Sequence, residues 1–96
     1  MHFKTGDKIK FKAEKKRYTI QACDDRFLIC TKPFAARKTY IYTVVDLKEN
    51  IRGTVNLIFG PAEDYSLPEE AQVALKEFQA GKYEVSHRNR INLDIE

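Results

Sequence analysis

The chain has 96 residues, of which 17 are Lys or Arg and 14 are Asp or Glu, giving a formal net charge of +3. With 43% hydrophobic and 11% aromatic residues it is too apolar for a disordered chain, and its length suits a single domain, residues 1–96. No apolar stretch approaches the roughly 20 residues that cross a bilayer, and the charged N-terminal residues do not match a signal peptide, so we expect a cytoplasmic protein with no membrane partner.

The first three strand candidates lie in the N-terminal third. Residues 8–12 alternate strictly, so that Ile9 and Phe11 face the interior and the lysines between them face solvent. Residues 17–23 and 26–31 are both rich in strand-forming side chains. These patterns predict consecutive antiparallel hairpins.

The turn between the second and third strands sets their register. If Asp24-Asp25 forms a two-residue turn, the facing pairs all lie on one face of the sheet: Ala22 with Phe27, Ile20 with Ile29, and Tyr18 with Thr31. In that register Cys23 and Cys30 are too far apart for a disulfide.

The middle of the chain predicts a connector and two more strands. We expect residues 32–38 to form the connector, because Pro33 removes a donor from any strand ladder. Residues 39–47 are apolar on both faces, as in a central strand. Residues 50–53 are typical of a turn, and residues 55–59 alternate as a further strand.

One helix is well signalled near the C-terminal end. Ser66 and Glu69 match a capping box, and Gly81 suits the end of the helix. The apolar stripe at helical spacing consists of Leu67, Ala71, Ala74, Leu75 and Phe78. Residues 82–96 alternate again, either as one strand or as two. The whole pattern predicts an α+β protein: a small antiparallel, strongly curved sheet or partly open barrel of five to six strands with one helix.

The charge of the chain is unevenly distributed. Residues 1–40 hold 11 Lys or Arg against 4 Asp or Glu, a net +7, whereas residues 41–96 hold 6 against 10, a net −4. A basic half is suited to binding phosphate. The alternative is that its lysines are the solvated face and turn of an edge hairpin, where they discourage aggregation.

The most unusual short segment is residues 87–90. Arg88 and Arg90 would project to one face of a strand, where their forked donors suit phosphate or carboxylate. The alternative is that they pair across strands with nearby acids. The candidate ligand contacts from the sequence are Arg88, Arg90, Lys32, Arg37, Phe34 and His87.

Catalytic and metal chemistry have little support in the sequence. The two histidines and two cysteines lack zinc-ligand spacing, and no nucleophile motif accompanies His87. Adjacent carboxylates such as Asp24-Asp25 are usually turn formers. We therefore expect no enzyme activity, no metal and no cofactor.

Three stretches together resemble small uncharacterised proteins carried by phages and other mobile elements of Gram-positive bacteria: residues 17–27, residues 42–47 with 51–53, and residues 85–90 with 93–95. The resemblance attaches no catalytic motif and implies an accessory or counter-defence factor.

Two functions follow from the sequence and the resemblance. The first is a non-enzymatic binding module that takes an anionic ligand, nucleic acid or nucleotide, through a basic surface. The second is a protein-binding inhibitor of a host defence enzyme. A homodimer formed through an edge strand is a further expectation.

Overall fold

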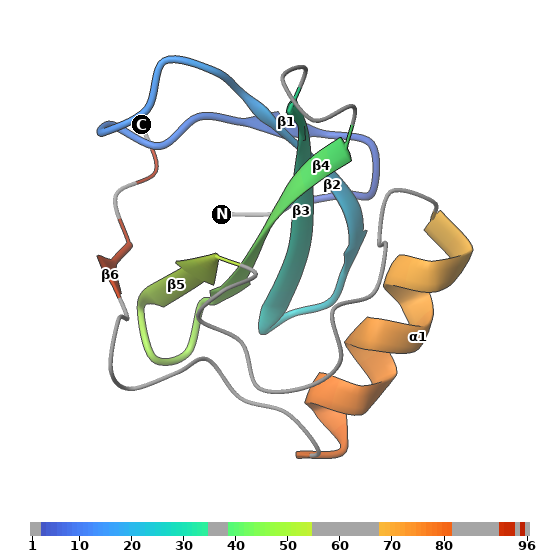
Figure 1. The fold of residues 1–96 in the computed structure, drawn as a ribbon. Helices are drawn as coiled ribbons and strands as arrows, with labels where there is room; N and C mark the ends of the chain where they lie inside the picture. The colour runs from blue at the N-terminus through green and yellow to red at the C-terminus, as the bar shows by residue number, and fades with distance from the viewer. Residues whose placement is uncertain (1–2, 35–38, 55–67, 82–90, 94, 96) are drawn as a thin grey trace.

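The computed structural model describes residues 3–34, 39–54, 68–81, 91–93 and 95. Within them, six antiparallel strands form one sheet in the order β1-β2-β3-β4-β5-β6, with one helix late in the chain (Figure 1). The elements are β1 (Lys8–Ile9), β2 (Tyr18–Cys23), β3 (Phe27–Phe34), β4 (Thr39–Asp46), β5 (Ile51–Thr54), α1 (Pro68–Gln79) and β6 (Ile91–Asn92).

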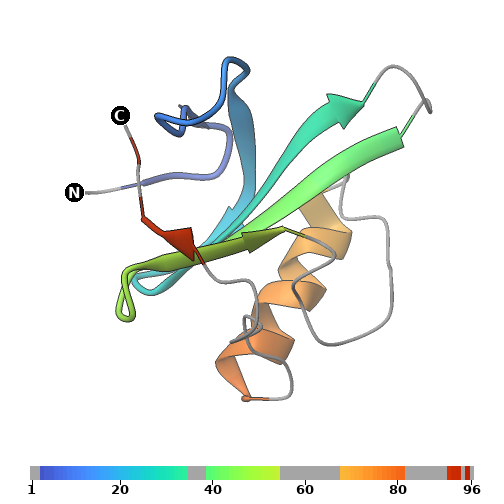
Figure 2. The ribbon, with the colours of Figure 1, turned by 60° about the vertical axis from the view of Figure 1, so that its left-hand side comes forward.

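The predicted α+β class with an antiparallel sheet and one late helix is confirmed. The sheet curls but does not close into a barrel. An isolated antiparallel bridge joins Phe11, just after β1, to Ile95, just after β6. Helix α1 covers one face of the sheet, and the N-terminal segment and β6 lie on the opposite side (Figure 2). No helix in the described part of the chain is long and apolar enough to span a membrane.

Both faces of the sheet are buried, so the protein has two apolar clusters. Helix α1 packs against the first, which consists of Ala22, Phe27, Ile29, Tyr42, Val44, Ile51, Ala71, Ala74, Leu75 and Phe78. The second lies on the other face and consists of Ile9, Phe11, Tyr18, Ile20, Leu28, Cys30 and Val45. Strand β4 contributes to both, as expected of a central strand that is apolar on both faces.

The predicted register of the β2–β3 hairpin is wrong. Ile20 pairs with Cys30, and Ala22 pairs with Ile29, because a bulge at Gln21 adds one residue to β2. The turn is also longer than two residues: the Asp24 Oδ1 accepts the backbone N–H of Arg26 at 2.7 Å and that of Phe27 at 2.6 Å. Tyr18 and Ile20 therefore lie on the face opposite Ala22, Phe27 and Ile29.

The prediction that Pro33 interrupts the sheet is wrong. It lies within β3 and pairs with Tyr40 of β4. The pairing of β3 with β2 ends at Thr31, so β3 has one neighbour at residue 33 and is an edge there. Proline is tolerated at an edge, where a missing N–H need not cost a ladder hydrogen bond.

The predicted turn at residues 50–53 is also wrong. Only Asn50 has the left-handed backbone of a turn, with φ of 58°, and β5 begins at Ile51. The strand predicted over residues 55–59 lies outside the described residues.

The helix agrees with its prediction. Ala71, Ala74, Leu75 and Phe78 are buried, and the Phe78 ring lies 5.6 Å from that of Phe27. Gly81 ends the helix with φ of 76°, and its N–H donates to the carbonyl of Phe78 at 3.1 Å. Leu67 and the Ser66 cap lie outside the described residues.

Candidate anion-binding site

A basic loop, residues 10–17, connects β1 to β2. The turn within it is closed by the Glu14 N–H, which donates to the Phe11 carbonyl at 3.0 Å. Its exposed cations are Lys12, Lys15, Lys16 and Arg17. None of these four forms an ion pair with a carboxylate of the described residues.

Glu14 is the one acidic residue of the basic loop, and it points inward. Its Oε1 accepts hydrogen bonds from the Lys32 Nζ at 2.6 Å and the Tyr18 hydroxyl at 3.0 Å. Its Oε2 accepts from the Arg52 Nη1 at 2.7 Å. We call these four residues the Glu14 cluster. It draws its donors from β2, β3 and β5, and it leaves the outer surface of the loop cationic.

Aromatic rings support the two cations of the Glu14 cluster. The Arg52 guanidinium carbon lies 3.9 Å from the centroid of the Phe11 ring, and the Lys32 Nζ lies 4.9 Å from that of Tyr18. The two rings contact each other edge to face at 5.3 Å. Cations over aromatic faces are stabilised by the ring quadrupole. The cluster is therefore a built arrangement in which both cations have fixed positions.

The cluster is mostly buried. The Arg52 side chain is 4% exposed, that of Lys32 15% and that of Glu14 23%. Burial alone would raise the pKa of Glu14, but the hydrogen bonds from Lys32, Arg52 and Tyr18 outweigh it and hold that pKa below its ordinary value. Burial would lower the pKa of Lys32, but Glu14 reverses this and the pKa is raised. Burial raises the pKa of Tyr18. All three groups keep their usual charge states at neutral pH.

The structure describes the side chain of one residue among the candidate contacts named from the sequence. Lys32 lies in the Glu14 cluster, where its ammonium is engaged by a carboxylate and a ring. The backbone of Phe34 ends β3. Arg37, His87, Arg88 and Arg90 lie outside the described residues, and their role in binding stays a prediction.

Sequence reasoning missed Glu14, Tyr18 and Arg52 as members of one site. The sequence predicts a turn over residues 50–53, which include Arg52, and pairs Tyr18 with Thr31, so neither prediction brings these residues to Glu14. Glu14 and Arg52 are 38 residues apart, so no local spacing joins them. One feature of the sequence points to the site: Glu14 is the one acidic residue among the cations of residues 10–17, a setting that favours an ion pair.

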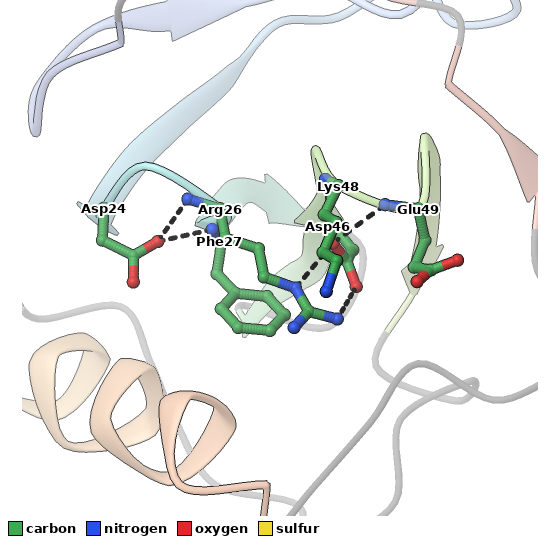
Figure 3. Close-up of polar contacts among 6 residues, drawn as sticks. All are labelled: Asp24, Arg26, Phe27, Asp46, Lys48 and Glu49. Carbon is green, nitrogen blue, oxygen red and sulfur yellow. Dashed lines mark hydrogen bonds and ion pairs between the residues drawn. The ribbon is translucent and has the colours of Figure 1, made fainter.

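A second polar cluster joins the β2–β3 turn to the β4–β5 turn (Figure 3). The guanidinium of Arg26 donates to both carboxylate oxygens of Asp46, at 3.0 and 2.9 Å. The Asp46 Oδ1 also accepts the backbone N–H of Lys48 at 3.1 Å and of Glu49 at 3.2 Å. The backbone bonds close the β4–β5 turn, and the ion pair ties it to the β2–β3 turn, so we assign this cluster a structural role.

A hollow of about 440 Å³ opens beside these turns. Its lining residues are Phe3, Asp25, Leu47, Asn50, Leu93 and Ile95. Asp25 is the one charged residue among them, and its carboxylate repels anions. This hollow is therefore unsuited to a phosphate-bearing ligand.

Both cysteines are free thiols, as predicted. Cys30 is fully buried, and that burial raises the pKa of its thiol. Cys23 is partly buried, and its thiol donates to the Phe3 carbonyl at 3.5 Å. Burial therefore disfavours the thiolate form of Cys30 that a reactive cysteine needs.

In comparisons with known proteins, no family model matches the chain, and no curated protein or solved structure matches it.

Proposed function

We propose that the protein is a non-enzymatic binding module that takes an anionic ligand, nucleic acid in particular, on its basic loop. The observation that carries the proposal is the outward cationic surface of residues 10–17. Lys12, Lys15, Lys16 and Arg17 are exposed without an ion pair to the described residues, while Glu14 is turned inward.

The physical basis is electrostatic. Cations that release counterions from a phosphate backbone give binding that weakens as salt rises. The loop is held in place by the Glu14 cluster, so its cations are presented on an anchored turn and less ordering entropy is lost on binding. Lysine and arginine contacts of this kind orient a strand without reading its sequence.

The test is fluorescence anisotropy of a labelled single-stranded oligonucleotide at several salt concentrations. We compare the double variant Lys15→Ala/Lys16→Ala with the matched control Lys48→Ala/Lys76→Ala, whose lysines are also exposed but lie on the β4–β5 turn and on α1. If both loop lysines contact phosphates, the loop variant should lower the slope of log affinity against log salt by about 1.4, since each single-strand contact contributes about 0.7. Equal slopes for the loop variant and the control would refute the proposal.

The alternative is a protein-binding inhibitor of a host defence enzyme. Among the described residues, Tyr40 on β4 and Val73 on α1 are the exposed large hydrophobic side chains, and they lie on different elements. They supply no continuous apolar patch of the kind that anchors protein interfaces. A partner retained from host lysate after nuclease treatment would favour this alternative over the first.

A further inference from the structure

The Glu14 carboxylate lies in a cradle that resembles a phosphate site. Tyr18, Lys32 and Arg52 donate to its two oxygens from three different strands. A guanidinium, an ammonium and a hydroxyl that converge on one point form the donor set that proteins use for phosphate. The three donors belong to the sheet, whereas the carboxylate belongs to the basic loop.

A second observation in the cradle concerns Thr43. Its hydroxyl oxygen is fully buried and has no hydrogen-bond partner among the described residues. The Thr43 hydroxyl lies close enough to the Tyr18 hydroxyl to lower the pKa of Tyr18 against the effect of burial, but the two groups do not meet the geometry of a hydrogen bond. A buried polar group without a partner is destabilising and calls for an explanation. A carboxylate has two oxygens, whereas a phosphate group has at least three and so has an oxygen left for a further donor.

We propose that the cradle of Tyr18, Lys32, Arg52 and Thr43 is a phosphate-binding site that Glu14 occupies as an internal substitute. When a phosphate of the ligand enters the cradle, the Glu14 side chain turns out toward solvent while the buried Phe11 stays packed against Arg52. This inference rests on the proposed function, which supplies the ligand, a nucleic acid. One phosphate of that ligand enters the cradle, and the loop cations contact the neighbouring phosphates. No covalent bond changes, and the exchange is one anion for another.

The position of the basic loop permits this exchange. The loop lies on the side of the sheet away from α1, and its outer residues are exposed (Figure 2). Glu14 itself is 23% exposed, so the route to the cradle opens to solvent along the loop. Arg52 remains fixed against the Phe11 ring at 3.9 Å, so the cradle keeps its shape without the carboxylate.

The test uses the full chain carrying Glu14→Ala, with inorganic phosphate as the probe. Thermal unfolding is followed while phosphate replaces chloride at constant ionic strength. We expect the melting temperature of Glu14→Ala to rise by about 3 °C in ~20 mM phosphate, as for a site with a Kd of about 10 mM. The unsubstituted chain should gain less, because Glu14 competes for the cradle.

Two double variants separate the cradle from general charge effects. Adding Lys32→Ala to Glu14→Ala should abolish the phosphate response, whereas adding Lys76→Ala, on the far side of the sheet, should leave it. If Glu14→Ala does not fold, the near-isosteric Glu14→Gln is titrated in its place, with the side-chain NMR signal of Arg52 as the readout. No phosphate response beyond that of the unsubstituted chain, or an equal response after Lys32→Ala, would overturn the inference.

This result is independent of oligonucleotide binding. Salt-dependent binding through Lys15 and Lys16 without a phosphate response in Glu14→Ala would refute the cradle alone. A phosphate response without that binding would refute the proposed function and keep the cradle.

Discussion

Asp46 joins two hairpin turns. The loss in the free energy of unfolding when its carboxylate is removed shows how much this connection stabilises the protein. Its carboxylate is 7% exposed and accepts four hydrogen bonds, two from Arg26 and two from the turn backbone. The Arg26 side chain is 42% exposed and can be hydrated after the loss, so the ion pair itself contributes about 0–1 kcal/mol. The two backbone bonds add about 1 kcal/mol each. We therefore expect Asp46→Ala to lower the free energy of unfolding by about 2–3 kcal/mol.

The isosteric Asp46→Asn separates the contribution of the turn hydrogen bonds from that of the ion pair. Its amide oxygen can still accept the N–H groups of Lys48 and Glu49, while the ion pair to Arg26 is lost, so we expect a cost of about 1 kcal/mol. Asp25→Asn makes the same chemical change at an exposed neighbour and should cost under about 0.5 kcal/mol. Urea unfolding with a shared m-value measures all three. Equal losses for Asp46→Ala and Asp46→Asn would refute a stabilising role for the turn hydrogen bonds.

Further predictions concern acid stability, the helix end and the thiols. Because the pKa of Glu14 lies below its ordinary 4.5, the unfolded chain protonates first as the pH falls. The contribution of ionised Glu14 to the free energy of unfolding is therefore complete above that value and is lost as the pH falls below it. Glu14→Gln should make the urea midpoint depend less on pH between about pH 5 and about pH 3. An unchanged pH dependence would contradict this. Gly81→Ala should cost about 1 kcal/mol in urea unfolding, because φ of 76° strains an alanine although its Cβ would meet no atom within 4 Å; a neutral result would contradict the strain. In the native protein, iodoacetamide should label the buried Cys30 far more slowly than Cys23, as peptide mass spectrometry would report, and equal rates would contradict its burial.

Alternation and capping predicted the elements that depend on local sequence. Ile9 and Phe11 are buried because a two-residue period places them on one face, and Gly81 ends the helix because it adopts a left-handed backbone at little cost. The errors arose where one residue changes the register. Nothing local distinguishes a bulge at Gln21 from regular strand, and the Asp24 side chain closes a turn longer than its sequence suggested.

The candidate site was less predictable because its residues come from distant parts of the chain. Lys32 was expected to be an outward contact in a connector. Continuation of β3 through Pro33 instead places Lys32 on the same face as Leu28 and Cys30, toward Glu14. That outcome depends on β2 ending its pairing at Thr31, which is a property of the sheet and not of the sequence around Lys32.

The bulge at Gln21 also determines whether the Glu14 cluster can form. In a regular strand, Tyr18, Ile20 and Ala22 would all point to one face. With the extra residue, Ala22 joins the cluster under α1, where a small side chain suits close helix packing, while Tyr18 joins the opposite face. Without the bulge, a Tyr18 side chain on the helix side could not donate to Glu14, and the basic loop would lose a contact that anchors it. One inserted residue therefore links the packing of the helix to the presentation of the cations.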